Sequence, residues 1–130
     1  MTSEAFEFVF VDDEPDIRDI YEVFLSSLFG EELKFEFFLN GEECLKYLEK
    51  HEMQRKHFLI ISDINMPKMD GFTLLKNISN DYINAEVALS SAYDNPDYKE
   101  KGYSLGAIDF IPKPVDFTKI AQLIRDRIKA

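Results

Sequence analysis

The sequence predicts an α/β domain in which a parallel sheet is covered by helices on both faces. Short runs rich in aromatic and β-branched residues alternate five times with longer segments whose apolar residues recur at helical spacing. The run 58–61, Phe-Leu-Ile-Ile, shows no polar alternation, which is typical of a strand buried on both faces. This repeated order of strand and helix indicates right-handed βαβ units, and such units form parallel sheets.

The length and composition are those of one folded domain, which we predict over residues 1–130. A hydrophobic content of 45% with 12 Phe is sufficient for a core. The net charge of -10 argues against direct binding to nucleic acid, which depends on basic surfaces, and favours a bound cation or a basic partner. We expect no membrane span, because no apolar run is long enough, and a cytoplasmic location, because a secretory signal pattern is lacking.

The first strand and helix are indicated by a change of hydrophobic period. Residues 6–11 are aromatic and β-branched, as in a strand, and acidic residues follow them directly. Pro15 suits the first turn of a helix, whose apolar residues recur at helical spacing over 17–28 until Gly30 ends it. A second strand is predicted at 34–39.

The middle of the chain continues the alternation. The second helix is predicted to begin at Gly41 and to carry Cys44, the only cysteine, on a face packed against the core. The polar residues 51–57 then lead into the central strand. Apolar positions over 72–78 mark the third helix, and residues 81–85 are predicted to be its exit loop.

The last part of the chain repeats the pattern twice. A strand at 86–90 precedes a short helix within 95–106, which has few apolar residues for packing. The strand at 107–111 is followed by Pro-Lys-Pro at 112–114, and a proline on either side of the lysine is expected to stop the strand at once. The final helix begins near the start of 116–128 and has one apolar and one charged face.

Polar side chains follow four of the predicted strands at their carboxyl ends. They are Asp12 and Asp13 after the first strand, Asp63 after the third, Ser91 after the fourth and Lys113 after the fifth. In a parallel sheet these ends share one edge, which is where ligands bind in open α/β sheets. We therefore expect these side chains to converge.

The predicted cluster requires positive charge, because three neighbouring carboxylates oppose one another's ionisation. Mg²⁺ prefers such oxygen ligands, and the expected ligands are the carboxylates of Asp12, Asp13 and Asp63 and the backbone carbonyl of Asn65. A metal, a lysine and a hydroxyl around a carboxylate suit phosphoryl transfer, whose transition state spreads negative charge over three oxygens. The carboxylate itself is a nucleophile for phosphoryl groups.

The chain resembles the receiver domains of two-component response regulators from Phe6 to Ile128. The resemblance resides in four motifs, in this order: Val11-Asp12-Asp13-Glu14, Ser62-Asp63-Ile64-Asn65-Met66-Pro67-Lys68-Met69-Asp70-Gly71, Ser91-Ala92 and Lys113-Pro114. It implies a flavodoxin-like doubly wound sheet with five parallel strands in the order 2-1-3-4-5 and five helices. It also implies a cis peptide between Lys113 and Pro114.

The resemblance assigns roles to individual residues. Asp63 is similar to the phosphoacceptor, Lys113 to the lysine that contacts the phosphate and Ser91 to the switch hydroxyl. Phe110 stands where the family has an aromatic residue that turns inward during switching, and Ser91 replaces a more frequent threonine. Tyr93 is expected at the rim of the pocket, where it would slow attack by water. The implied metal ligands are Asp12, Asp13, Asp63 and Asn65.

The function implied is a phosphorylation-controlled switch. A histidine kinase or phosphotransfer protein would donate the phosphoryl group, and a protein target or output domain would read the surface of the fourth helix, fifth strand and fifth helix. The chain is expected to catalyse only its own phosphorylation and dephosphorylation. Whether it acts alone or as the amino-terminal part of a larger protein, and whether phosphorylation causes dimerisation, stay open at this point.

Two other interpretations compete with the switch. A pseudo-receiver keeps the fold as a binding module without phosphorylation, but such domains usually lack one of the acidic or lysine residues that are present here. A hydrolase with an aspartyl-phosphate intermediate would normally need a cap over its substrate, and 130 residues leave no room for one.

Overall fold

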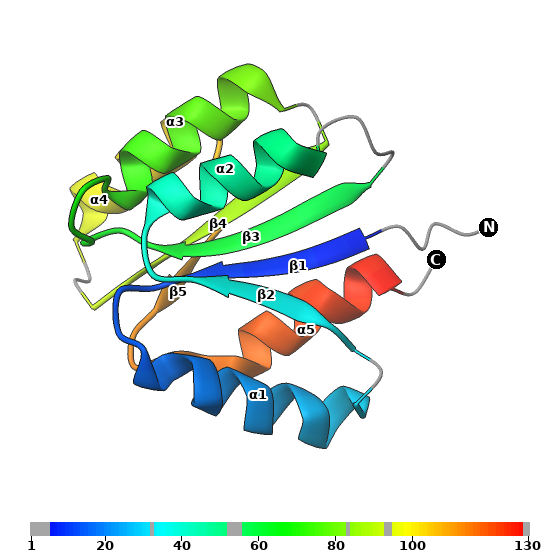
Figure 1. Ribbon diagram of the computed structural model, residues 1–130. Coiled ribbons are helices and arrows are strands. Elements are labelled where there is room, and N and C mark those ends of the chain that lie inside the picture. Colours follow the sequence, from blue (N-terminus) through cyan, green and yellow to red (C-terminus); the bar gives the residue numbers. More distant parts are fainter. Residues whose placement is uncertain (1–5, 32, 52–55, 83, 93–94, 129–130) are drawn as a thin grey trace.

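The computed structural model describes residues 6–31, 33–51, 56–82, 84–92 and 95–128, and in it each strand is followed by a helix, as predicted (Figure 1). The strands are β1 (Phe6–Val11), β2 (Phe35–Phe38), β3 (His57–Asp63), β4 (Ala85–Ser91) and β5 (Asp109–Pro112). The helices are α1 (Asp16–Phe29), α2 (Gly41–His51), α3 (Gly71–Asp81), α4 (Pro96–Ser104) and α5 (Phe117–Ile128).

The five strands form one parallel sheet in the order β2-β1-β3-β4-β5, which confirms the predicted flavodoxin-like topology. Helices α1 and α5 cover one face of the sheet, and α2, α3 and α4 cover the other (Figure 1). β1 lies between β2 and β3, and the later strands β4 and β5 extend the sheet beyond β3. The carboxyl ends of all five strands lie at one edge because every pair is parallel.

Two hydrophobic cores lie on the two faces of the sheet, and alternate strand residues contribute to each. Ile60 and Leu89 belong to the core that contains buried residues of α2 and α3. Ile61 and Ala88, their neighbours in the chain, belong to the core that contains residues of α1 and α5. β3 is buried from Phe58 onward, as its uninterrupted apolar run predicts.

Helix α1 packs through a narrower stripe than its sequence suggests. Tyr21 and Leu25 are buried, whereas Ile20 and Leu28 are 47% and 43% exposed. Cys44 on α2 is buried in the core, which confirms its predicted placement. Among the described residues, no helix is both long enough and apolar enough to cross a membrane.

Two predicted boundaries were wrong by short distances. Pro112 does not stop the strand before it but is the last residue of β5, paired with Ser91. β5 is an edge strand, where a missing N–H is tolerated on the side without a partner. Asp81 belongs to α3 rather than to its exit loop. Gly102 lies inside α4, and a Cβ there would come within 2.9 Å of the Leu89 side chain, so this glycine permits close packing on the sheet.

Candidate functional site

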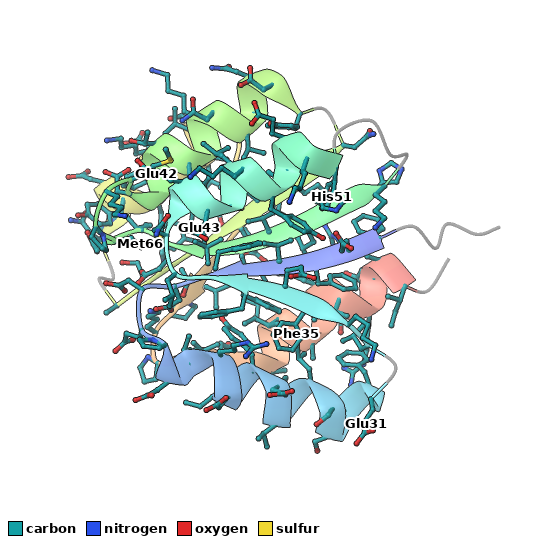
Figure 2. The ribbon with its side chains drawn as sticks, viewed as in Figure 1. Glu31, Phe35, Glu42, Glu43, His51 and Met66 are labelled. Atoms are coloured by element: carbon teal, nitrogen blue, oxygen red, sulfur yellow. The ribbon has the colours of Figure 1, made fainter. Side chains whose placement is uncertain are left out.

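The predicted convergence at the carboxyl edge of the sheet is present. Asp12 directly follows β1, Asp63 is the last residue of β3, and Ser91 is the last residue of β4. Lys113 follows β5, and its backbone N–H donates a hydrogen bond of 2.9 Å to the carbonyl oxygen of Ser91. Met66 lies in the loop at this end of the sheet, far from His51 at the opposite end (Figure 2).

Lys113 joins the two buried carboxylates. Its Nζ donates hydrogen bonds of 2.8 Å to Oδ2 of Asp12 and 3.1 Å to Oδ2 of Asp63. A third carboxylate, that of the exposed Glu14, lies 3.9 Å from the same nitrogen. Asp12 and Asp63 are only 3% and 8% exposed, so their charges are compensated largely by this single ammonium group.

The electrostatics of the site raise the pKa of the Asp63 carboxyl group. Burial raises the pKa of Asp63, the nearby charge of Asp12 raises it further, and the ammonium of Lys113 opposes both effects. Burial acts to lower the pKa of Lys113, but the hydrogen bonds and charges of Asp12 and Asp63 outweigh burial and raise it. Lys113 is therefore a stable cation beside a carboxyl group, that of Asp63, which is costly to ionise.

Three carboxylates form a group with the dimensions of a metal site. One carboxylate oxygen each of Asp12, Asp13 and Asp63 lies within 4.8 Å of the others, and Asp13 is the exposed member. Oδ1 of Asp12 also accepts a 3.0 Å hydrogen bond from the backbone N–H of Glu14, which fixes the orientation of that carboxylate. A partly hydrated divalent cation with oxygen ligands fits this donor set.

The loop after Asp63 is held close to the strand by a glycine. The backbone N–H of Gly71 donates a 2.7 Å hydrogen bond to the carbonyl oxygen of Ile64. A Cβ at Gly71 would lie 2.4 Å from the backbone oxygen of Asp63, so no other residue fits without displacing the end of β3. Asp70 caps α3, because its Oδ1 accepts a 2.8 Å hydrogen bond from the N–H of Thr73.

The predicted switch residues lie together on the face of the sheet that α4 covers. Ser91 alternates with Leu89 on β4, and Leu89 packs in the same core as Phe110. Ser91 and Phe110 also line one cavity of about 210 Å³. Phe110 is 4% exposed, so its ring already points inward in this state.

Two other predicted site residues are less closely defined. Asn65 is exposed in the loop after β3, two residues beyond Asp63, and its role as a carbonyl ligand stays a prediction. Tyr93, predicted at the pocket rim, lies outside the described residues.

Two residues near the carboxylates were not predicted to belong to the site. Tyr21 on α1 is buried, and its ring stacks on Phe10 at a centroid distance of 4.1 Å. Burial raises the pKa of Tyr21, and the charges of Asp12 and Asp63 raise it further, so a neutral phenol lies within electrostatic range of both acids. Ser90 is also buried. The signal for Ser90 was the polar pair at the end of an otherwise apolar strand.

The chain is similar to known response regulators in sequence. It is 37% identical to response regulator GtcR of Aneurinibacillus migulanus over 103 residues, which are 79% of this chain and 39% of GtcR. It is 34% identical to the DNA-binding transcriptional regulator NtrC of Escherichia coli K12 over 118 residues, which are 91% of this chain and 24% of NtrC. The chain thus spans well under half the length of these relatives.

Solved structures agree with this similarity. A chain of the CheX-CheY-BeF3-Mg²⁺ complex from Borrelia burgdorferi superimposes with a TM-score of 0.78 at 30% identity, covering 93% of this chain and 87% of that one. The signal receiver domain of a DNA-binding response regulator from Colwellia psychrerythraea 34H has a TM-score of 0.81 at 22% identity. The match covers 96% of this chain and 99% of that one, which shows the shared fold. The sequence-family model of the response regulator receiver domain matches residues 8–125 of this chain. The chain therefore belongs to the response regulator receiver domain family.

Proposed function

We propose that Asp63 accepts a phosphoryl group and that its phosphorylation switches a protein-binding surface. The observation that carries this proposal is the geometry around Lys113, whose ammonium group contacts both Asp12 and Asp63. A fixed positive charge therefore lies beside a buried carboxylate at the edge of the sheet where open α/β folds bind ligands, which supports a role for Asp63 as a nucleophile.

The chemistry follows from this arrangement. An Asp63 oxygen attacks the phosphorus of a phosphodonor, a new O–P bond forms, and the donor's leaving group departs with the electron pair of the broken bond. Lys113 moves from the carboxylate to an oxygen of the transferred group, where it balances the charge that spreads over the phosphoryl oxygens. Asp12, Asp13 and Asp63, with the carbonyl of Asn65, would hold Mg²⁺, which when bound supplies further positive charge for those oxygens.

The proposed switch uses the cavity that Ser91 and Phe110 share. The Ser91 hydroxyl donates a hydrogen bond to the phosphoryl group, and the ring of Phe110, which is already buried, shifts further into the space that Ser91 leaves. Phe110 is in β5 and lies beside α4, where a Cβ on Gly102 would come within 3.4 Å of its ring. Movement of the ring therefore changes the surface of α4, β5 and α5, which we propose as the output surface.

The proposed phosphodonor is a histidine kinase or a phosphotransfer protein. The proposed downstream partner, which binds the output surface, is a protein target or an output domain. Two similar structures support protein partners of this kind. One is the complex of the phosphotransfer protein Ypd1 with the receiver domain of Ssk1 from Saccharomyces cerevisiae, and the other is the CheX-CheY complex. The chain acts as a catalyst only on its own phosphoryl group.

The test is the intact mass of the chain after incubation with acetyl phosphate. We expect one added phosphoryl group that requires both Mg²⁺ and Asp63 and is therefore lost in Asp63→Asn. Asp109→Asn is the control, because Asp109 is the first residue of β5 and pairs with Lys119 rather than with Lys113. Absence of an adduct in a folded chain that also fails to bind beryllofluoride would indicate a pseudo-receiver. Continuous release of phosphate from a phosphomonoester would indicate a hydrolase.

A further inference from the structure

The hydroxyl group of Ser90 is the unexplained polar group of the site. Ser90 is 2% exposed, and its Oγ has no hydrogen-bond partner in the described part of the chain. Buried hydroxyl groups are nearly always hydrogen-bonded, because desolvation without a partner costs free energy. An apolar residue at this position would avoid that cost, so the buried hydroxyl indicates a functional role for Ser90.

Ser90 lies directly beside Asp63 in the sheet. The two residues are register partners in the parallel pair of β3 and β4, and the backbone N–H of Ile64 donates a 3.0 Å hydrogen bond to the carbonyl of Ser90. Adjacent strands are about 4.8 Å apart, a separation that a serine hydroxyl and an aspartate carboxylate bridge in a suitable rotamer.

The two side chains also share a face of the sheet. Asp63 alternates with Ile61, and Ser90 alternates with Ala88, and both of those residues pack in the core beneath α1 and α5. Ser91, the proposed switch residue, points to the other face. Ser90 and Ser91 therefore approach Asp63 from opposite sides of the sheet, and their roles are separable.

Ser62 provides an internal comparison. It is as deeply buried as Ser90 and adjoins Asp63 in the chain, but its Oγ donates a 2.9 Å hydrogen bond to the backbone carbonyl of Asp63. Ser62 alternates with Ile60 and so faces the opposite core. The hydroxyl of Ser62 is therefore hydrogen-bonded, whereas that of Ser90 has no hydrogen-bond partner in the described part of the chain.

We propose that the Ser90 hydroxyl donates a hydrogen bond to the Asp63 oxygen that bears the phosphoryl group. This inference rests on the proposed phosphoacceptor function. In the unmodified chain that oxygen is served by Lys113, but Lys113 moves to the phosphoryl oxygens after transfer. Ser90 then becomes the donor on this face of the sheet.

The consequence is a shorter lifetime of the phosphorylated state. In hydrolysis, water attacks phosphorus and passes a proton to the released phosphate or to solvent. The bond between phosphorus and the Asp63 oxygen breaks, and its electron pair stays on that oxygen to restore the carboxylate. Because the transition state is loose, much of this negative charge has already developed when the barrier is crossed. A donor aimed at that oxygen stabilises the departing carboxylate and accelerates dephosphorylation.

The experiment measures two rates on Ser90→Ala, namely phosphorylation by acetyl phosphate and loss of the phosphoryl group after the donor is removed, both by intact mass with Mg²⁺ present. We expect the lifetime to increase about tenfold, the effect of losing one hydrogen bond to a charged oxygen. Phosphorylation should be no slower, because the same donor stabilises the attacking carboxylate. Ser90→Thr, which keeps the hydroxyl, should restore the short lifetime.

Ser62→Ala is the matched control, since it removes a buried hydroxyl that bonds to backbone rather than to the carboxylate. It should lower the melting temperature without lengthening the lifetime. If Ser90→Ala does not fold, Ser90→Cys, which keeps the volume with a weak donor, replaces it and should also lengthen the lifetime.

An unchanged lifetime in a folded Ser90 variant would overturn the inference, as would a fall in both rates that Ser90→Thr shares. Failure of the native chain to form any adduct would instead refute the phosphoacceptor function, and with it the role of Ser90.

Discussion

Lys113 and Asp12 are 101 residues apart in the chain, yet Nζ of the lysine lies 2.8 Å from Oδ2 of the aspartate. Their side chains are only 15% and 5% exposed. The pair joins the first strand of the chain to the segment after the last one. Asp63 contacts the same ammonium group, so the one positive charge of Lys113 compensates two carboxylates.

Removing Lys113 should destabilise the folded chain through the charges that it leaves behind. We expect Lys113→Met to lower the free energy of unfolding by about 2 kcal/mol at pH 7, since a broken buried pair leaves uncompensated carboxylates. Urea titration at several pH values measures this effect, which should shrink toward pH 3 as the carboxylates protonate. Lys56→Met, which breaks a more exposed pair with Glu7, should cost less than about 1 kcal/mol. Equal losses in the two variants would contradict the prediction.

The raised pKa of Asp63 predicts a direction for the pH dependence of stability. Between the unperturbed value of 3.8 and the higher pKa of the folded state, the folded chain binds this proton more tightly than the unfolded chain. The contribution of Asp63 to stability is therefore present at low pH and is lost as pH rises through this window. Without metal, Asp63→Asn should be more stable than the native chain at pH 7, and the difference should disappear near pH 3. Denaturant titrations across that range test it, and a difference that is constant with pH would contradict it.

Gly71 should tolerate no side chain. Gly71→Ala would place a Cβ 2.4 Å from the backbone oxygen of Asp63, an atom that cannot move without shifting the end of β3. We expect a loss of about 2–3 kcal/mol of unfolding free energy and slower phosphorylation. Gly41→Ala is the control, because the three atoms nearest to its Cβ would all belong to the side chain of Met69, the first being the sulfur at 3.0 Å. It should change stability by less than about 1 kcal/mol.

Cys44 should be inert in the folded chain. Its side chain is fully buried, and burial raises its pKa to about 12, so almost no reactive thiolate is present at pH 8. A thiol reagent such as Ellman's reagent should therefore label it only as fast as the chain opens, whereas in concentrated urea one equivalent should react at once. Rapid labelling of the native chain would show that α2 is loosely packed.

The sequence was sufficient for the fold and for most of the site because both depend on local patterns. Buried parallel strands are continuous apolar runs, and a residue at the end of such a strand must lie at the ligand-binding edge. Asp12, Asp63 and Lys113 were predictable for this reason. Their separations were not, because they depend on how far each strand extends relative to its neighbours.

The residues that sequence reasoning missed depend on tertiary context. The sequence of β4 has no regular alternation of polar and apolar residues, so it does not reveal which face of the sheet carries the Ser90 side chain. Only the register between β3 and β4 shows that Ser90 is the partner of Asp63. Tyr21 falls on the apolar stripe of α1, and only the packing of that helix brings its phenol near the two acids. Pro112 was expected to end a strand, and the edge position of β5 relieved that constraint.

The span between Asp12 and Lys113 also has a consequence during synthesis. A nascent chain that has emerged only as far as β4 carries Asp12 and Asp63 but not yet Lys113, whose ammonium group contacts both carboxylates in the folded chain. The site is complete only when Lys113, which follows the edge strand β5, has been synthesised. A chain truncated before residue 113 therefore lacks the cation that contacts both carboxylates, and under the proposed function we expect it not to accept a phosphoryl group.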